Sequence, residues 1–504
     1  MPLLLNDRRF AELTISIGAM LTSLVLSVIH LAFDPLPNPD GVVYLLAAQA
    51  WLDEGYGAAA AIYPLPVYSI LIAWAHAASG LGLLTSAHCL DAFLIAGSVV
   101  GLQRLVAALG GTVRAQLIVV VLVLLLPELN GYRSFLLRDF AYWMFALFAL
   151  VLLVHHSIAP TFSRAAGFVA MCGFAAAFRA EAILLLVATP LALPFGEVGR
   201  RAFVMLAICA SVVAASVALV FVALSAPPST VWLVQTLHQA ISLAAEVPGG
   251  MEAQIAGFGA HVLDPRFHDY AASGVAGGLV AMIAVHVCNA ASLPLTALAI
   301  AGLATGVSGC IDRRGARIVF AAFGVSILAL AAVLMARGII QTRYAMPSGL
   351  LLLVIAAFAI DSWYARANSP STRLRRASTL LVVYLLGEAA FGLFNSKHQY
   401  VDAARWLAQY TEPNARIFST DLRVLYLADR PVNWRNPNAD ASAAMAPAGT
   451  YDYWVVNAAR DGAEADAFAS TSGVSPVVQF ANRKGQALRI YAASSPTTEP
   501  GLVR

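Results

Sequence analysis

Runs of about twenty apolar residues recur along the chain from Thr14 to about Phe394. A helix of this length crosses roughly 30 Å of hydrocarbon and satisfies its own backbone hydrogen bonds there. Of the 504 residues, 60% are hydrophobic and 12% are charged, which lies outside the range of soluble globular domains. The sequence therefore predicts an α-helical polytopic membrane protein.

Hydropathy predicts about eleven transmembrane helices, at residues 12–33, 87–108, 115–130, 140–156, 164–178, 181–196, 202–226, 277–308, 317–336, 344–361 and 377–394. With the N-terminus in the cytoplasm, the loops on that side carry most of the arginines, from Arg8 and Arg9 to Arg375 and Arg376. This positive-inside bias predicts a cytoplasmic N-terminus and an extracytoplasmic C-terminal segment. No small-residue cleavage site follows the first apolar run, so we interpret it as an uncleaved helix.

One apolar stretch, residues 60–84, is not counted as a transmembrane helix. Counting it would invert the orientation of every later loop and place the arginine-rich loops on the outer side. Its two prolines, Pro64 and Pro66, fit interfacial helices. We therefore expect a first outer loop at about 34–86, with an amphipathic helix at 42–54 and a juxtamembrane hairpin after it. A long outer loop is expected at 226–274.

Residues after the last span have an ordinary soluble composition. "VDAARWLAQY" has the pattern of an amphipathic helix, "ARIFST" and "YDYWVVNA" those of strands, and "VVQFANRKGQALRIYAA" that of a hairpin. The predicted domains are a transmembrane domain at 1–394 and a small α/β extracytoplasmic domain at 395–504. The net charge of +3 gives no reason to expect nucleic acid, and the five cysteines have no metal-ligand spacing.

Two aspartates lie at the predicted outer face beside apolar spans. Asp40 follows the first span by a few residues, and Asp139 begins the fourth. A carboxylate at this depth is costly without a partner, so each is a candidate base toward an acceptor hydroxyl or a ligand of a divalent metal ion. Capping of a helix by either residue, or pairing of Asp139 with Arg138, explains them equally well.

Arginines and aromatic residues lie on the same predicted side. Arg138, Arg179 and Arg343 are candidates for binding a phosphate, because a guanidinium pairs with phosphate through two parallel hydrogen bonds. The alternative is snorkelling to lipid headgroups, and for Arg179 an internal pair with Glu181. Candidate substrate-lining residues, which could instead belong to the interfacial aromatic belt, are Tyr44, Tyr63, Tyr132 and Tyr344.

Five motifs follow one another along the chain: "PDGVVYLLAAQAWLDEG", "YPLPVYSILIAWAHAASGLG", "NGYRSFLLRDFAYWMFAL", "AAFRAEAILLL" and "QTRYAMPSGLLLL". With a helix-then-strands outer domain after them, they resemble the GT-C superfamily of polytopic membrane glycosyltransferases. The resemblance is strongest to the bacterial branch that includes lipid A aminoarabinose transferases, protein O-mannosyltransferase-like enzymes and Rgt-type transferases. One departure is Gly41 after Asp40, where some members have a second acidic residue.

The resemblance implies an inverting transfer of a hexose or pentose from a polyprenyl-phosphate carrier. The acceptor would be a lipid, a glycan or a protein on the extracytoplasmic side of a bacterial inner membrane. It further implies that Asp40 is a base or orients the acceptor, and that Asp139 shares a divalent metal ion with it or supports the site. Arg138, Arg343 and Arg179 would then neutralise the departing phosphate.

Other functions remain open on the sequence alone. A flippase or transporter for lipid-linked saccharides would use a similar apolar chain, although no half-to-half similarity is visible. An O-antigen ligase-like enzyme would use the same carrier class with an arginine-rich outer loop, whereas residues 226–274 contain only Arg266 as a basic side chain other than histidine. A catalytically inactive scaffold is a further alternative.

Overall fold

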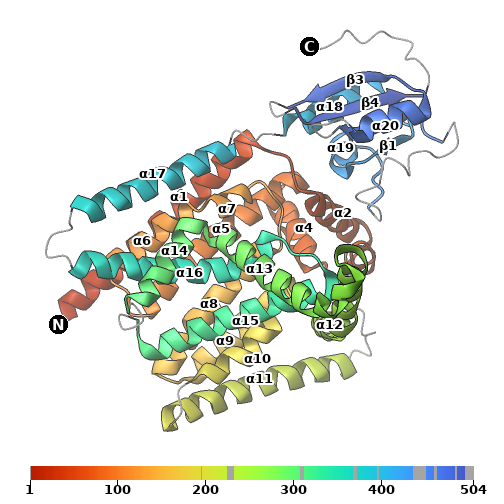
Figure 1. Ribbon diagram of the computed structural model, residues 1–504. Helices are drawn as coiled ribbons and strands as arrows, with labels where there is room; N and C mark the ends of the chain where they lie inside the picture. The colour runs from red at the N-terminus through yellow and green to blue at the C-terminus, as the bar shows by residue number, and fades with distance from the viewer. Residues whose placement is uncertain are drawn as a thin grey trace. The chain divides into compact units, whose positions relative to one another are not determined.

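The computed structural model describes residues 2–193, 196–223, 232–306, 311–366, 372–393, 397–434, 450–458, 463–482 and 485–493 (Figure 1). The chain divides into two compact units. The helical unit consists of Met1–Val28, Cys89–Arg133 and Arg138–Gly392, and the mixed unit of Ile29–His88, Ser134–Leu137 and Leu393–Arg504. The predicted domains at 1–394 and 395–504 stay a prediction, and the mixed unit combines the C-terminal segment with two loop segments from earlier in the chain.

Long apolar helices form the helical unit. They are α1 (Pro2–Phe33), α5 (Leu83–Ala108), α6 (Val113–Leu124), α7 (Pro127–Gly131), α8 (Asp139–Ile158), α9 (Phe162–Phe178), α10 (Ala182–Ala188), η1 (Thr189–Ala192), α11 (Glu197–Ala223), α12 (Trp232–Val262), η3 (Pro265–Tyr270), α13 (Ala271–Ala291), α14 (Leu293–Ala304), α15 (Arg313–Arg337), α16 (Thr342–Arg366) and α17 (Thr372–Leu393). In the described part of the chain, seven helices are long and apolar enough to cross a membrane, and several shorter helices are also apolar. The protein is therefore a multi-pass membrane protein, as predicted.

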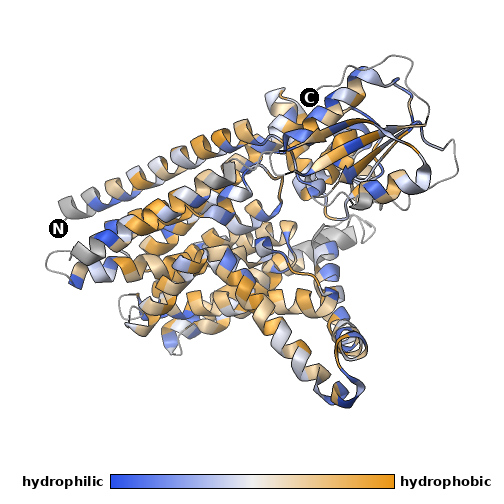
Figure 2. Cartoon of the chain, turned by 45° about the horizontal axis from the view of Figure 1, so that its top comes forward, coloured by the Kyte–Doolittle hydropathy of each residue, from blue (hydrophilic) through white to orange (hydrophobic). Residues whose placement is uncertain are grey.

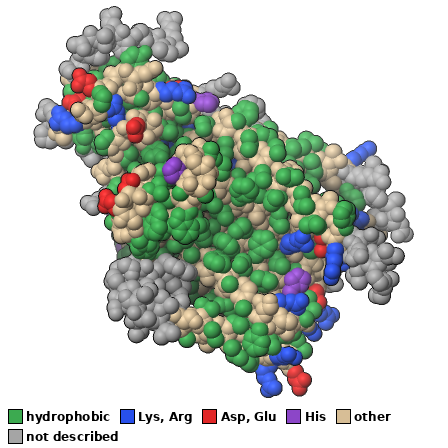
Figure 3. Space-filling model, turned by 180° about the vertical axis from the view of Figure 1, so that it is seen from behind, with side chains coloured by type: hydrophobic (Ala, Val, Ile, Leu, Met, Phe, Trp, Pro, Cys, Tyr) green, Lys and Arg blue, Asp and Glu red, His purple; other side chains and the backbone are tan. Residues whose placement is uncertain are grey.

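The helices of this unit are mainly hydrophobic (Figure 2), and many of their apolar side chains are exposed. Val280 and Leu328, for example, expose 69% and 67% of their surface. The face in Figure 3 presents a broad hydrophobic area over the helical unit. Such a large apolar surface fits contact with lipid chains rather than water.

Three predicted single spans are each two helices in the structure. Residues 115–130 form α6 and α7, residues 181–196 contain α10 and η1, and residues 277–308 contain α13 and α14. In each pair, the second helix has a proline at its first or second position: Pro127, Pro190 or Pro294. Because proline has no backbone N–H, it cannot continue the hydrogen bonds of the preceding helix. Between α13 and α14, Ser292 also has a positive φ of 64°.

The expected long loop at 226–274 is mainly helical in its described part, residues 232–274, which corrects the prediction there; residues 226–231 lie outside the described residues. α12 packs against α15, and the side-chain amide of Gln254 donates to the carbonyl oxygens of Leu334 and Met335 at 3.0 and 2.8 Å. These carbonyls lie in the last turn of α15, where that of Leu334 also accepts from the backbone N–H of Gly338 at 2.9 Å. The helix in this segment thus depends on a tertiary contact that hydropathy does not reveal.

Arginines from several predicted cytoplasmic loops gather at one end of the helical unit, here called the arginine end. Hydrogen bonds between helix ends bring them together: Arg8 to the carbonyl of Gly111 at 3.2 Å, Arg314 to that of Ser157 at 3.3 Å, Arg366 to that of Thr305 at 3.3 Å, and Arg114 to the side chain of Asp361 at 2.5 Å. The backbone N–H of Asp312 also donates to the carbonyl of Leu109. Side chains separated widely in sequence therefore share one end of the bundle.

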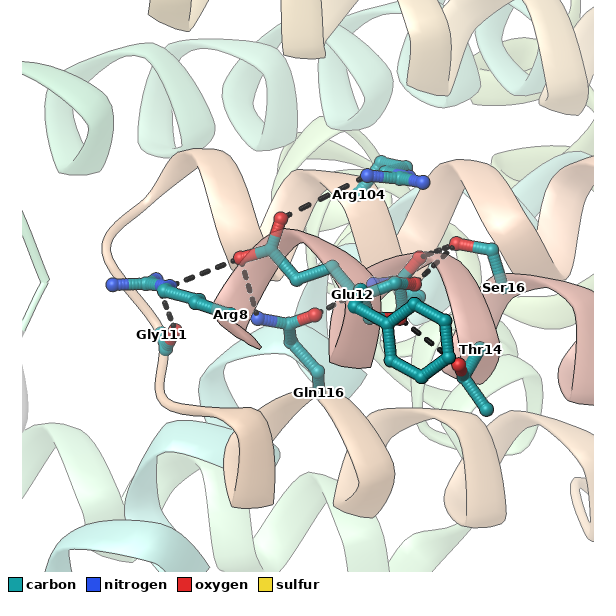
Figure 4. Close-up of polar contacts among 9 residues, drawn as sticks. Arg8, Glu12, Thr14, Ser16, Arg104, Gly111 and Gln116 are labelled. Carbon is teal, nitrogen blue, oxygen red and sulfur yellow. Dashed lines mark hydrogen bonds and ion pairs between the residues drawn. The ribbon is translucent and has the colours of Figure 1, made fainter. Parts of the chain in front are cut away.

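Figure 4 shows how a carboxylate organises part of the arginine end. Glu12 on α1 lies between Arg8, at 3.0 Å, and Arg104, at 3.8 Å. The side-chain amide of Gln116 donates to the same carboxylate at 3.4 Å. α1, α5 and α6 are thereby joined by a polar network, which satisfies groups that would be costly to leave unpaired in an apolar bundle.

The mixed unit begins with short helices in the segment between α1 and α5. They are α2 (Pro39–Glu54), α3 (Tyr56–Ile62) and α4 (Val67–Ser79). α2 starts three residues before the predicted helix at 42–54, because Pro39 has the φ that the first helical position requires. The segments expected to form an amphipathic helix and a juxtamembrane hairpin are thus helical, and their position at a membrane surface stays a prediction.

The C-terminal part of the mixed unit is a small α/β fold, as predicted. Its elements are α18 (His398–Tyr410), β1 (Ile417–Ser419), α19 (Leu422–Leu427), β2 (Tyr453–Ala458), α20 (Ala463–Ser472), β3 (Pro476–Ala481) and β4 (Ala487–Ala492). The sheet order is β1-β2-β4-β3, with β1 parallel to β2 and the other pairs antiparallel. The strands carry a mixture of apolar and polar side chains (Figure 2). We call this fold, residues 397–493 as described, the C-terminal platform.

Candidate active site

Asp139 and Arg179 form a buried ion pair in the helical unit. Asp139 is the first residue of α8, and Arg179 follows the last residue of α9. Their side chains expose 3% and 9% of their surface, and a guanidinium nitrogen of Arg179 donates to a carboxylate oxygen of Asp139. The partner that this carboxylate needs at its depth is therefore Arg179, forty positions away.

Glu181 makes a second carboxylate contact with the same guanidinium. Arg179 donates to the two oxygens of Glu181 at 2.7 and 3.3 Å. The charge of Arg138 also acts on Glu181. One guanidinium is thus shared by two carboxylates, so this trio has a formal charge of −1. The proposed internal pair of Arg179 with Glu181 is present, but Asp139 belongs to it as well.

Aromatic rings surround Arg179. Its guanidinium carbon lies 4.4 Å from the ring centroid of Tyr344 and 6.0 Å from that of Tyr142. Arg343 lies over the same Tyr344 ring, at 5.3 Å. A cavity of about 20 Å³ beneath the cluster is lined by these tyrosines, Arg179 and Glu181, with Ser326. Cation–π contact compensates part of the cost of burying two guanidinium groups near each other.

Tyr132 joins the site through a carboxylate that the sequence analysis missed. Its hydroxyl donates to Glu128 at 2.5 Å, and the charges of Arg343 and Asp139 act on it. Burial, and then the Glu128 carboxylate, raise the pKa of Tyr132 above its usual value, so the phenol stays protonated and donates. The signal was the spacing of four between Glu128 and Tyr132, which puts both on one face of α7 and its C-terminal turn.

Asp40 lies in the mixed unit, in the first turn of α2 and half-buried. The residue before the helix, Asn38, does not cap it; its side-chain oxygen accepts a hydrogen bond from the backbone N–H of Leu136 at 2.8 Å. A Cβ on Gly41 would come within 2.7 Å of that oxygen and 2.9 Å of the Cβ of Leu136. Glycine after Asp40 is therefore needed for the close approach of segment 134–137.

Tyr44 and Tyr63 form part of an aromatic cluster in the mixed unit. The ring of Tyr44 packs edge-on against Tyr63 at 5.0 Å and against Tyr68 at 5.1 Å. Tyr44 and Tyr68 are almost fully buried, exposing 4% and 1% of their surface. Tyr44 thus contributes to the core of its segment, and Tyr63 is half-buried at its edge.

The structure brings together a group of predicted residues within the helical unit, and Asp40, Tyr44 and Tyr63 belong to the mixed unit. The helical-unit group is Arg138, Asp139, Arg179, Arg343, Tyr132 and Tyr344. In the described residues no group of three or more His, Cys, Asp or Glu side chains could hold a metal ion. Asp139 is paired with Arg179, and a divalent metal ion at Asp40 and Asp139 stays a prediction.

Comparison with known proteins shows the fold. No protein-family profile and no curated protein matches the sequence. The oligosaccharyltransferase AglB of Archaeoglobus fulgidus, solved with an inhibitory peptide and a dolichol-phosphate, has a TM-score of 0.56 over 97% of this chain and 75% of its own, at 12% identity. The same organism's oligosaccharyltransferase tethered to an acceptor peptide gives 0.53 over 95% and 74%, at 13% identity.

ArnT of Cupriavidus metallidurans, bound to undecaprenyl phosphate, covers 96% of this chain and 99% of its own at 13% identity, but its TM-score of 0.42 is too low to support an inference. The two likenesses above 0.5 extend over nearly the whole chain. The fold of this protein is accordingly similar to that of these two oligosaccharyltransferase structures. The predicted fold class, an α-helical polytopic membrane protein with a small C-terminal α/β fold, is confirmed.

Proposed function

We propose that this protein is a membrane glycosyltransferase that moves a sugar from a polyprenyl-phosphate carrier to an acceptor hydroxyl. The observation that carries the proposal is the buried cluster of Asp139, Arg179 and Glu181, with Arg343 stacked beside it. The GT-C fold, shared with an oligosaccharyltransferase solved with dolichol-phosphate, supports a lipid-phosphate donor. The acceptor class, whether lipid, glycan or protein, is left open.

The reaction divides the charged residues into two roles. Arg138 and Arg343 are the proposed phosphate ligands, since a departing phosphate carries charge that fixed cations stabilise. Arg179 is occupied by two carboxylates, so its proposed role is to keep Asp139 ionised and oriented rather than to bind phosphate directly. Asp40, half-buried at the start of α2, is the proposed base for the acceptor hydroxyl.

The proposed orientation places the arginine end in the cytoplasm. Its arginines outnumber the carboxylates described beside them, Glu12, Asp312 and Asp361, and such an excess is retained on the cytoplasmic side of bacterial membrane proteins. The N-terminus then lies in the cytoplasm of a bacterial inner membrane, with the C-terminal platform outside. Accessibility of single cysteines placed at residues 9 and 405 to a membrane-impermeant reagent tests this orientation.

Asp40→Asn and Asp139→Asn in the full chain test the function. Purified protein in proteoliposomes would receive radiolabelled undecaprenyl-phosphate sugars, one sugar at a time, together with lipid, glycan and peptide acceptor fractions from the same cells. Each variant should lower transfer about 100-fold or more, the usual loss for a removed general base or electrostatic support. Asp53→Asn is the matched control, because Asp53 is exposed on α2 and, among the described residues, its side chain bonds only to Gln49, at 2.9 and 3.1 Å.

Full transfer by both variants would contradict the assigned roles. Movement of the lipid-linked sugar across the bilayer without any glycosylated product would instead favour the flippase or transporter alternative. A loss of transfer by Asp53→Asn equal to that of Asp40→Asn would show that the effect comes from any charge change on α2.

A further inference from the structure

The C-terminal platform contains a buried side chain from a distant loop. Leu36, from the segment between α1 and α2, exposes 2% of its surface and lies in the same core cluster as platform residues from α18, α19 and the sheet. These residues include Trp406, Leu407, Val424 and Ile490. α2 also lies against α19. The core of the platform is therefore incomplete without residue 36.

The chain between Leu36 and Asp40 is stiff. Its sequence is Leu-Pro-Asn-Pro-Asp, with a further proline, Pro35, before Leu36. Each proline fixes its own φ and restricts the residue before it to extended conformations. The four-residue connection from Leu36 to Asp40 therefore has little conformational freedom. Burial of Leu36 consequently restricts the position of Asp40 as well.

Charged residues reinforce this attachment. Asp34 is half-buried, and the positive charges of Lys397 and Arg423 act on it. Arg423 is itself held over the ring of Tyr400, at 4.2 Å, and pairs with Asp421 at 2.5 Å. The attraction between a partly desolvated carboxylate and two platform cations favours the position in which the loop segment lies against the platform.

A second loop segment meets the same surface. The ammonium of Lys397 lies 5.4 Å from the ring centroid of Phe135, and Asn38 binds the backbone N–H of Leu136. Segment 134–137 continues directly into Arg138 and α8. The platform and the 34–41 segment therefore both contact residues 134–137, the segment that leads into α8.

We propose that the C-terminal platform is a positioning element of the transferase, and that Leu36 is the residue through which it sets the location of Asp40. This inference rests on the proposed function, because it assigns Asp40 a catalytic role. The platform then acts on the rate of transfer without itself contacting the donor. Small displacements of a catalytic group cost about 100-fold in rate when its geometry is otherwise correct.

Leu36→Ala in the full chain tests the proposal, with Phe468→Ala as the matched control. Phe468 exposes 3% of its surface in the platform's other core cluster, which does not include Leu36. Both changes remove a large apolar side chain from the platform. Two readouts are needed: transfer of label from the undecaprenyl-phosphate sugar on which the wild type is active, and amide hydrogen exchange over residues 38–48.

Leu36→Ala should lower kcat at least tenfold, leave KM for the donor within about threefold, and speed exchange in the first turns of α2. Leu36→Met, which refills the site with a side chain of similar volume, should restore kcat to within about threefold. Phe468→Ala should lower the melting temperature of the platform but leave kcat and the exchange of residues 38–48 unchanged below that temperature.

Equal loss of kcat in Leu36→Ala and Phe468→Ala, in proportion to lost stability, would overturn the positioning role. So would unchanged exchange over residues 38–48 in Leu36→Ala. An inactive wild-type protein would contradict the proposed function instead, and in that case the exchange experiment still decides whether Leu36 restrains the start of α2.

Discussion

The side-chain oxygen of Asn38 accepts a hydrogen bond from the backbone N–H of Leu136 at 2.8 Å, across almost a hundred residues of sequence. Asn38 occupies the N-cap position of α2 and exposes only 5% of its surface, yet its side chain makes no capping bond. An ordinary local capping residue is thus used for a tertiary contact between two loop segments.

Asn38→Ala should destabilise the mixed unit by about 1–3 kcal/mol, because it leaves the buried N–H of Leu136 without its acceptor. Thermal unfolding followed by tryptophan fluorescence in detergent measures the change. Gln49→Ala is the control, since the side chain of Gln49 on the same helix bonds only to Asp53 within the described part of the chain, at the exposed surface. A melting temperature for Asn38→Ala equal to that of Gln49→Ala would argue against the contact.

Gly41→Ala should also be destabilising, by about 1–3 kcal/mol, since the new methyl overlaps Asn38 and Leu136. Gly57→Ala, where a Cβ meets nothing within 4 Å, is the matched control and should be neutral or slightly stabilising. We expect transfer to fall in Gly41→Ala and to be kept in Gly57→Ala. Wild-type stability of Gly41→Ala would show that segment 134–137 does not approach α2 closely.

Arg179→Met should be among the most destabilising single changes in the helical unit. It leaves Asp139 and Glu181 buried without their cation, and removal of one partner from a buried ion pair typically costs about 3–5 kcal/mol. Glu181→Gln should cost less, because Arg179 keeps Asp139. The melting temperatures of the two variants in detergent give the comparison. A larger fall in melting temperature for Glu181→Gln than for Arg179→Met would contradict the prediction.

Lys397→Met should make the stability of the mixed unit depend more strongly on pH. Burial raises the pKa of Asp34 and neighbouring Lys397 lowers it in part, so loss of the cation raises the folded-state pKa further above its ordinary value. A raised carboxyl pKa penalises the ionised folded state above that pKa, and the penalty disappears below the unfolded value of about 3.8.

The destabilisation by Lys397→Met should accordingly be present at pH 7 and shrink as the pH falls toward 4, as measured by melting temperature across that range. Asp34→Asn combined with Lys397→Met should remove the added pH dependence, because the carboxylate whose pKa Lys397 lowers is gone. A pH-independent loss in the single variant would mean that Lys397 acts through its packing on Phe135 alone.

Glu128 and Glu181 show why the site was only partly predictable. Asp139 and Arg179 were candidates because charged side chains beside apolar spans need partners, and that reasoning holds for each residue alone. The partner of each residue depends on how α8, α9 and α16 pack against one another. Arg179 pairs with Asp139, so its guanidinium is not free to bind a phosphate. Glu128 was not a candidate, because only the fold places the tyrosine that it binds near Arg343.

Hydropathy and the distribution of arginine by themselves determined the membrane class, most helix positions and the common side of the loop arginines, because transfer of apolar groups and charges into lipid depends on composition along the chain. Only the tertiary structure decided that Leu36 completes the core of a platform more than 360 residues later, that the segment at 232–262 is a helix, and that one guanidinium serves two carboxylates. Those outcomes depend on which surfaces come into contact. The free energy of a contact between distant segments depends on both segments and on their geometry, so neither segment alone predicts it.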